Sequence, residues 1–246
     1  MLSVVHSAPF PVDQTTMLDH NLQLIGTDES GAPFTPVHYS RGARLCLEGH
    51  PASGVFCICT GRAKEYFISQ HGKTAILRIS MPGDLVGLEP MLAGTAYATT
   101  VEAMEPTMAY FITRRDFQGL MRQDDTFRMR VAQQLSRRCK SAYSRVRRAG
   151  YAASIPARLA HFLLRWSRDM GAANQTYIRM GLTHEEISQL IGSTRETVSR
   201  VFARFRRCGW IRMEGTQLQI VKRDLLSDIA REQRAIGTER RLKKFG

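Results

Sequence analysis

Four polar side chains that could read the edges of nucleic-acid bases lie within six consecutive residues: Arg195, Glu196, Ser199 and Arg200. An arginine can donate two hydrogen bonds to O6 and N7 of a guanine, and a glutamate can accept one from the N4 amine of a cytosine. A serine hydroxyl can donate or accept. A surface that only binds phosphates would exclude a carboxylate, so Glu196 favours base reading over phosphate binding alone.

Two helices separated by a tight turn are predicted to position this quartet. Thr183 and Glu186 have the spacing of a capping box, which starts a helix at about His184. Gly192 then permits a sharp turn, because glycine adopts backbone conformations that other residues avoid. A short capped helix followed by a glycine turn is the first half of a helix-turn-helix.

The second helix is predicted from about Thr194 to Cys208, with Ser193 or Thr194 as its cap. Its apolar residues share one face, which leaves the quartet free of the core. Ser193, Thr194 and Thr197 lie near the helix N-terminus, where hydroxyls and backbone N–H groups bind phosphates. The apolar face consists of Val198, Val201, Phe202 and Phe205.

A helix before this unit and a hairpin after it complete the predicted C-terminal region. Pro156 can open a helix over Ala157–Met170, and Gly171 ends it. Two apolar segments, Trp210–Met213 and Leu218–Val221, flank a glycine turn and predict a β-hairpin wing.

Short apolar runs broken by glycine or proline characterise the chain from Val37 to about Thr113. The clearest runs are Val55–Thr60, Ala75–Ser80 and Ala109–Thr113. Regular short strands with glycine turns indicate an antiparallel sandwich or barrel.

Residues 124–150 carry an apolar stripe at coiled-coil spacing, flanked by many arginines. A seam this narrow and this cationic is typical of a helix that pairs with a copy of itself, so we predict a parallel homodimer. Packing of the stripe against the protein's own β domain is the alternative. The predicted seam comprises Val131, Leu135, Cys139, Ala142, Val146 and Ala149.

The charge of the chain is concentrated in its C-terminal half. The 246 residues have a net charge of +13; residues 1–115 contain 8 Lys and Arg against 10 Asp and Glu, and residues 116–246 contain 27 against 12. This asymmetry indicates a polyanionic partner, with a solvated basic face as the alternative. No apolar run approaches the roughly 20 residues that span a bilayer, and no secretory signal is evident, so a soluble cytoplasmic protein without membrane partners is predicted.

The five cysteines are odd in number and contain no CxxC pair, which argues against a disulfide framework and a zinc ribbon. Cys57 and Cys59 lie two apart and would point the same way on a strand. We interpret them as buried structural thiols, with redox or metal sensing as the alternative.

These features together resemble the cyclic-AMP receptor protein and fumarate–nitrate reduction regulator superfamily (Crp/Fnr) over about residues 36–225. The resemblance implies an α+β chain: a β jelly roll of the cyclic-nucleotide-binding type, a long dimerisation helix and a winged helix-turn-helix. It also implies a homodimer that binds double-stranded DNA and RNA polymerase. The expected divisions are an irregular arm at 1–35, the β domain at 36–120, the dimerisation helix at 121–150, the DNA-binding domain at 151–230 and a basic tail at 231–246.

The motif Arg195-Glu196-Thr197-Val198-Ser199-Arg200 is the strongest part of the resemblance. In this family the equivalents of Glu196 and Arg200 read a G·C pair in each half of a palindromic site. The form E-x-x-S-R is similar to the oxygen and nitrogen-oxide branch, which favours TTGAT-like half-sites. Arg195 is similar to the cyclic-AMP branch, which favours TGTGA. Both half-sites stay open.

The effector region departs from the family pattern. Leu88 stands where the family has a ribose-binding glutamate, and the segment 97–101 has no arginine for the cyclic phosphate. A buried phosphate without a counter-charge is costly, so cyclic AMP is not expected to bind in the family manner. The pocket candidates are Gly87, Leu88, Glu89, Tyr97 and Thr99.

The cysteines and histidines bear on whether the protein holds another cofactor or is an enzyme. Residues 1–45 contain no cysteine, which argues against the iron–sulfur cluster of the oxygen-sensing branch. A haem-based gas sensor stays an alternative, because His38, His50, His71 or His161 could supply a ligand. The HExxH motif of zinc proteases would need a histidine where Ser188 stands, so no enzyme is predicted. A nonspecific architectural DNA-binding protein is the other alternative.

Overall fold

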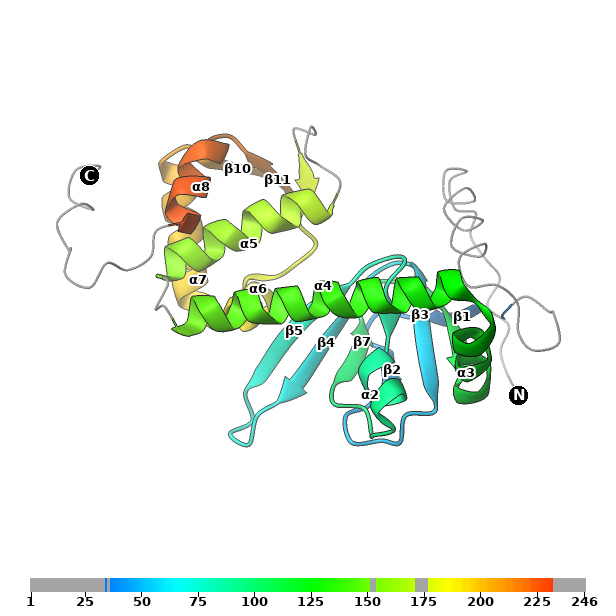
Figure 1. Cartoon of the computed structure of the whole chain (residues 1–246). Helices are drawn as coiled ribbons and strands as arrows, with labels where there is room; N and C mark the ends of the chain where they lie inside the picture. The colour runs from blue at the N-terminus through cyan, green and yellow to red at the C-terminus, as the bar shows by residue number, and fades with distance from the viewer. Residues whose placement is uncertain (1–33, 35, 151–153, 171–176, 232–246) are drawn as a thin grey trace. The chain divides into compact units, whose positions relative to one another are not determined.

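The computed structural model describes residue 34 and residues 36–150, 154–170 and 177–231 (Figure 1). The predicted arm apart from Phe34, the predicted helix end at Gly171 and the tail beyond Arg231 lie outside the described residues, as do the side chains of residues 147–150. The strands are β1 (Pro36–Tyr39), β2 (Arg44–Cys46), β3 (Gly54–Thr60), β4 (Ala63–Ile68), β5 (Thr74–Ser80), β6 (Leu85–Val86), β7 (Thr100–Ala103), β8 (Thr107–Thr113), β9 (Ile178–Arg179), β10 (Ile211–Glu214) and β11 (Gln217–Ile220). The helices are α2 (Leu88–Ala93), α3 (Arg114–Gln123), α4 (Asp125–Gly150), α5 (Ile155–Asp169), α6 (His184–Ile191), α7 (Arg195–Arg207) and α8 (Arg223–Arg231).

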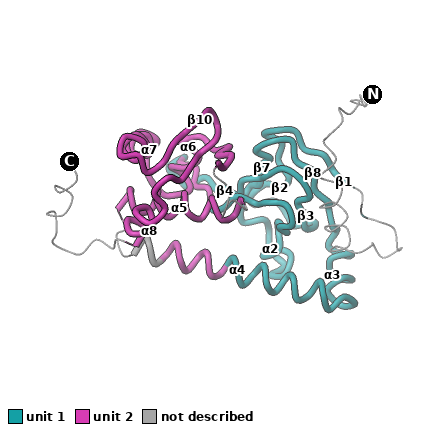
Figure 2. The backbone as a smooth tube through the Cα atoms, turned by 90° about the horizontal axis from the view of Figure 1, so that it is seen from above, with its two compact units in different colours: residues 1–72, 77–138 teal, residues 73–76, 139–246 magenta. Residues whose placement is uncertain are grey.

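The chain forms two compact units, which Figure 2 shows in different colours. The first contains residues 1–72 and 77–138, and the second contains residues 73–76 and 139–246. The helix α4 begins in the first unit and continues into the second.

The first unit is built on two four-stranded sheets with the orders β1-β8-β3-β6 and β2-β7-β4-β5. The predicted strands over residues 55–60, 75–80 and 109–113 are confirmed as β3, β5 and β8. The strand β3 is buried along almost its whole length. Its sequence is therefore a continuous apolar run and does not alternate between apolar and polar residues. Cys57 and Cys59 are free and buried, as predicted for structural thiols. The jelly-roll architecture expected from the resemblance is therefore present.

The N-terminal part of α4 packs on this β domain. Phe127 and Val131 are buried in its core and Leu135 packs against it. The Gln134 amide donates to the carbonyl oxygen of Gly83 (2.8 Å) and accepts from the N–H of Leu85 (2.9 Å). The predicted dimer seam is therefore wrong at Val131 and Leu135, because the protein's own core takes these two side chains.

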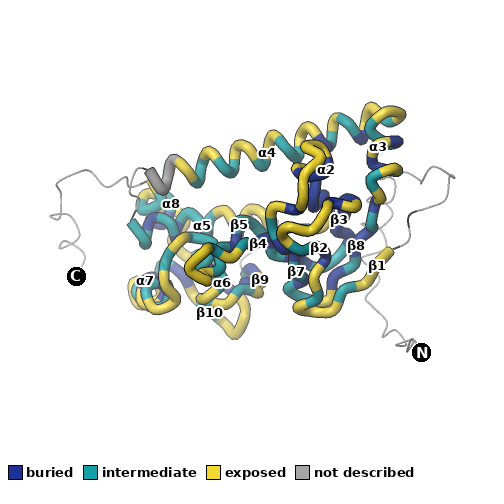
Figure 3. Tube along the Cα trace, turned by 90° about the horizontal axis from the view of Figure 1, so that it is seen from below, coloured by how far each residue is buried: buried dark blue, intermediate teal, exposed yellow. Residues whose placement is uncertain are grey.

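A second stripe along α4 is exposed at every position, and Figure 3 shows exposed residues recurring along this helix. Its large members Met129, Tyr143 and Val146 are 60%, 72% and 70% exposed. The steps between its members alternate between three and four, which is the coiled-coil repeat. The exposed stripe consists of Met129, Ala132, Ser136, Cys139, Tyr143 and Val146.

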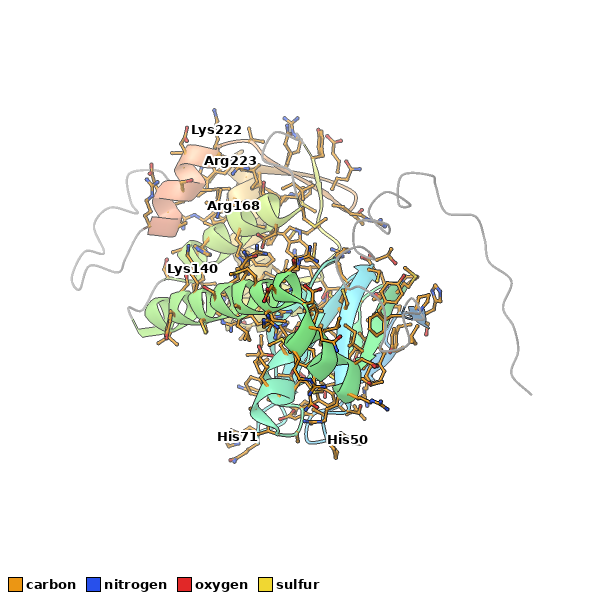
Figure 4. The ribbon with its side chains drawn as sticks, turned by 45° about the vertical axis from the view of Figure 1, so that its right-hand side comes forward. His50, His71, Lys140, Arg168, Lys222 and Arg223 are labelled. Atoms are coloured by element: carbon orange, nitrogen blue, oxygen red, sulfur yellow. The ribbon has the colours of Figure 1, made fainter. Side chains whose placement is uncertain are left out.

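The second unit contains a winged helix-turn-helix. The predicted wing is confirmed as the β10–β11 hairpin, to which β9 adds a third strand in the order β10-β11-β9. A further helix, α8, was not predicted from the sequence; it packs against α5 and buries Leu226. Arg223 at the start of α8, which is labelled in Figure 4, donates to the hydroxyl of Ser167 on α5 (2.8 Å).

Candidate nucleic-acid interface

The turn between α6 and α7 is held by hydrogen bonds at both ends of α6. The predicted capping box is confirmed: the Thr183 hydroxyl accepts from the N–H of Glu186 (3.1 Å), and the Glu186 carboxylate accepts from the N–H of Thr183 (2.9 Å). Gly192 ends the helix with φ of 65°, a left-handed conformation that favours glycine. These contacts fix where α6 stops and where the chain turns.

Arg158 of α5 reaches the C-terminal end of α6. Its guanidinium donates to the carbonyl oxygens of Ile191 (2.8 Å) and Gly192 (3.0 Å). The last carbonyls of a helix have no partner within the helix, and a cation there also favours the helix dipole. Local sequence patterns do not reveal this role of Arg158, because its partners are backbone atoms 33 and 34 residues away.

The second helix of the helix-turn-helix, α7, is the candidate recognition helix, and it begins at the cap that the sequence predicts. The Thr194 side chain accepts from the N–H of Thr197 (3.3 Å). The predicted apolar face is confirmed as buried, and it packs α7 against α5 and α6. Its members are Val198, Val201, Phe202 and Phe205. At the far end of α7, the ring of Trp210 lies 5.3 Å from that of Phe205 and anchors the start of the wing.

Three members of the predicted base-reading quartet are exposed on α7: Arg195, Glu196 and Arg200. Arg200 donates to the hydroxyl of Thr197 (3.2 Å), so its guanidinium lies along the helix surface beside a predicted phosphate-binding residue. Of the other predicted phosphate contacts, Thr194 is exposed and Ser193 is half-buried. No carboxylate in the described part of the chain forms an ion pair with an arginine of α7. Within the residues that the structure describes, the arginines of α7 are therefore not tied up in ion pairs.

Ser199 differs from the other members of the quartet. It is half-buried, and its hydroxyl lies 2.8 Å from Nδ1 of His184 at the start of α6. The ring of His184 also stacks on Phe202, with centroids 4.8 Å apart and planes 26° apart. Ser199 is therefore not fully free of the core, as the sequence predicts for the quartet, but half-buried beside α6. His184 is a further site residue that the spacing of the motif does not reveal.

Comparison with known proteins identifies this arrangement. A Crp-like helix-turn-helix domain model matches residues 157–229, and a cyclic nucleotide-binding domain model matches residues 36–124. The chain is similar to a CRP-like cAMP-activated global transcriptional regulator of Mycobacterium tuberculosis, with 26% identity over 80% of this chain and 88% of that one. It is also similar to the fumarate and nitrate reduction regulatory protein of Escherichia coli, with 25% identity over 87% and 84%. The chain belongs to the Crp/Fnr family of transcription regulators.

The structure of FixK2 from Bradyrhizobium japonicum has the same fold as this Crp/Fnr regulator. The TM-score is 0.72 at 23% identity, over 80% of this chain and 96% of that one. None of the helices in residues 88–150, 155–169 and 184–231 combines the length and the apolarity that a membrane crossing needs.

The effector candidates of this Crp/Fnr regulator surround the short helix α2. Gly87 precedes α2 with φ of 86°, and a side chain there would meet the ring of Tyr97. Leu88 is fully buried. Glu89 forms an ion pair with Arg138 of α4, and the charge of Arg138 offsets the burial of Glu89 and holds the pKa of its carboxyl below the usual value.

Two further candidates lie beyond α2. The hydroxyl of Tyr97 donates to the carbonyl oxygen of Gly54 (2.8 Å) and accepts from the N–H of Gly54 (3.3 Å). The hydroxyl thus satisfies the backbone groups that a neighbouring strand would otherwise satisfy. Thr99 is half-buried, and its carbonyl oxygen lies 3.9 Å from the thiol of Cys46. The structure brings Gly87 beside Tyr97, but the polar groups of Glu89 and Tyr97 are already engaged.

A polar network in the β domain was not anticipated from the sequence. Arg78 of β5 donates to the carboxylate of Glu65 (2.6 Å) and to the hydroxyl of Ser80 (2.8 Å). Ser80 in turn donates to Glu65 (2.5 Å). The three residues lie on neighbouring strands and satisfy one another, which the spacing of single charged residues along the sequence does not reveal.

The histidines considered as haem ligands belong to different elements and loops. His50 and His71 are exposed in loops (Figure 4), His38 is exposed on β1 and His161 is half-buried on α5. Within the described residues, no three His, Cys, Asp or Glu side chains gather as metal ligands would.

Proposed function

We propose that this Crp/Fnr regulator binds a palindromic DNA site as a homodimer and reads each half-site with α7. The observation that carries this proposal is the exposed face of α7. Arg195, Glu196 and Arg200 share it, no carboxylate among the described residues forms an ion pair with either arginine, and the opposite face is fixed in the core. Such a helix can enter the major groove and present two donors and one acceptor to base edges.

The neighbouring groups support a phosphate-binding rim around this face. Thr194 caps α7 and Thr197 lies in its first turn, where free N–H groups and the helix dipole favour an anion. Arg206 and Arg207 are exposed in the last turn, and Lys222 and Arg223 are exposed after the wing. These groups would position the duplex, whereas the base-reading residues would specify its sequence.

The exposed stripe on α4 supports the dimer. Large apolar side chains rarely line a long helix in water without a partner, and three of them recur here at coiled-coil spacing. A second copy of the chain would cover Met129, Tyr143 and Val146 with the same residues of its own helix. The two-fold axis would then place the two α7 helices about 34 Å apart, one turn of DNA.

The half-site is proposed from the resemblance. The E-x-x-S-R form, with Glu196, Ser199 and Arg200, favours a TTGAT-like half-site, and Arg195 favours a TGTGA-like one. Both sequences contain a G·C pair that Glu196 and Arg200 could share. RNA polymerase is the proposed second macromolecular partner, as expected for a regulator of this family.

Selection from a random duplex library tests the function. The full chain is incubated with the library, with and without cell extract, and bound DNA is sequenced. The expected result is an inverted repeat whose halves contain one of the two motifs. Retention of DNA without any enriched motif would favour the architectural alternative. Failure to retain any DNA under either condition would contradict the proposal.

A further inference from the structure

The imidazole of His184 is held by two contacts from α7. Nδ1 lies 2.8 Å from the hydroxyl oxygen of Ser199, and the ring face stacks on Phe202. Because both partners belong to the recognition helix, the position of the ring is tied to that of the base-reading surface. Ser199 lies one turn after Arg195 and directly precedes Arg200, so its hydroxyl adjoins the exposed cations.

The protonation state of the ring decides what Ser199 can offer to a base. A serine hydroxyl has one hydrogen to donate and two lone pairs that accept. When Nδ1 of a neutral ring accepts that hydrogen, only lone pairs are left, and these suit the amines of adenine or cytosine. When the ring is protonated, Nδ1–H can only donate, and the hydroxyl hydrogen is released toward O4 of thymine or O6 of guanine.

We propose that His184 is a positioning residue for base reading, which fixes the hydrogen-bonding role of Ser199 so that protonation of the ring changes the preferred base. This inference rests on the proposed function, since it assumes that α7 reads base edges. In the proposed arrangement, the neutral ring carries its hydrogen on Nε2, and Nδ1 accepts from the hydroxyl of Ser199. Sequence preference at one base pair of each half-site then depends on pH.

The surroundings of the ring favour its neutral form. Burial and the positive charge of Arg195 on α7 lower the pKa of His184 from its ordinary value of 6.5. On α6, Glu185 accepts from Gln189 and Glu186 is bound to Thr183. On α5, Arg158 is bound to the far end of α6.

The sign of the pH effect follows from this lowered pKa. Below the pKa the ring is charged and Ser199 is a donor; above it the ring is neutral and Ser199 is an acceptor. In the free protein the change falls below pH 6.5. DNA phosphates near the ring would stabilise its charged form, so binding moves the midpoint upward.

The first measurement uses nitrogen NMR of the full chain labelled at histidine. The expected spectrum at about pH 8 shows His184 with Nδ1 unprotonated, and the midpoint of its titration lies below the ordinary histidine value. A ring that is protonated on Nδ1 at about pH 8 would overturn the assignment, because Ser199 would then be a donor in both states.

The second measurement compares base preference at two pH values. The base pair read by Ser199 is identified as the one at which Ser199→Ala relaxes specificity, and all four pairs are tested there. The ratio of affinities for amine-bearing and carbonyl-bearing bases should change about three- to tenfold between about pH 8 and about pH 5.5, the value of one hydrogen bond. Each ratio is taken at one pH, so general effects of pH on phosphate binding cancel.

Variants separate His184 from other titrating groups. His184→Phe keeps a ring on Phe202 but removes the hydrogen bond, and His184→Gln keeps a polar group that does not titrate. Both, like Ser199→Ala, should bind DNA with a ratio that does not change with pH. If the affinity ratio still depends on pH in both His184 variants, the role of His184 is wrong. The same holds if the ratio is constant in a wild-type protein that still selects its site. Either result leaves the proposed function standing. Absence of any site selection would overturn the proposed function as well.

Discussion

Arg200 and Arg207 lie on the same helix but are expected to contact different parts of DNA. Arg200 is in the exposed face proposed to read bases, and Arg207 is in the last turn. Arg200→Ala should weaken binding to the selected site by about 1–3 kcal/mol, the value of a bidentate contact to a guanine, and leave scrambled DNA nearly unaffected. Arg207→Ala should weaken both duplexes equally and reduce the salt dependence.

Anisotropy titrations of both variants on both duplexes, at two salt concentrations, check this pair. If Arg200→Ala lowers the two affinities by the same factor, Arg200 is a phosphate contact and the assignment of the recognition face is wrong. Arg207→Ala is the matched control, because it removes the same charge from the same helix.

The engaged effector candidates predict weak binding of cyclic AMP. Glu89 is paired with Arg138, and the hydroxyl of Tyr97 is bonded to Gly54. A cyclic phosphate in this region would have to break such contacts without finding an arginine in the segment 97–101. Calorimetry should show no affinity tighter than about 1 μM, equivalent to about −8 kcal/mol. Tighter binding would show that another group, such as Arg78, supplies the counter-charge.

A site residue can be predicted from the sequence when the spacing within its own helix is enough to place it. Arg195, Glu196 and Arg200 could be assigned to the exposed face of α7 because the apolar residues of the helix occupy the opposite face. The contact between His184 and Ser199 joins two helices across 15 residues, and no periodicity encodes it. Arg158 was missed for the same reason.

At the scale of elements, Arg158 predicts how the turn of the helix-turn-helix is stabilised. Arg158→Ala leaves the carbonyl groups of Ile191 and Gly192 without their charged donor. Because the site is partly exposed, the expected cost is about 1–2 kcal/mol. Hydrogen exchange should therefore speed up several-fold or more in α6, with weaker binding to DNA. Arg168→Ala on the same helix is the control; equal exchange in the two variants would contradict the assigned role.

The exposed stripe on α4 predicts the effect of a charge at the proposed dimer seam. Val146→Asp would bury a carboxylate between two helices, so the protein should become monomeric and bind the palindrome weakly. Gln133→Asp places the same charge on an exposed position outside the stripe and should stay dimeric. Light scattering measures both, and a wild-type protein that is monomeric even with DNA would contradict the dimer. Mild oxidation should also link two copies through Cys139.

The difference between the predicted and observed stripes has a physical cause. Two sets of positions on α4 have coiled-coil spacing, and both contain apolar residues. The sequence does not show which set the protein's own β domain covers. In the structure it covers the set that begins at Phe127, whose ring contacts that of Phe117. The small helix α8 was missed because its apolar face is short and depends on α5 for cover.

At the scale of the whole molecule, the proposed DNA binding depends on two-fold symmetry. One α7 helix makes too few base contacts to find a site in a genome, whereas two copies on one face of the duplex combine their discrimination. The excess of positive charge in residues 116–246 adds affinity for any DNA but no preference. In the proposed dimer, specificity therefore depends on both the recognition helices and the distance between them.

Titration of the full chain with three duplexes tests this central claim most directly. They are the selected palindrome, the same palindrome with about five base pairs inserted at its centre, and a scrambled duplex of equal length. The insertion rotates one half-site by about half a turn, so it faces away from the second α7 helix. The account predicts that the insertion removes most of the roughly thousandfold or greater preference for the palindrome. Equal affinity for all three duplexes would contradict it.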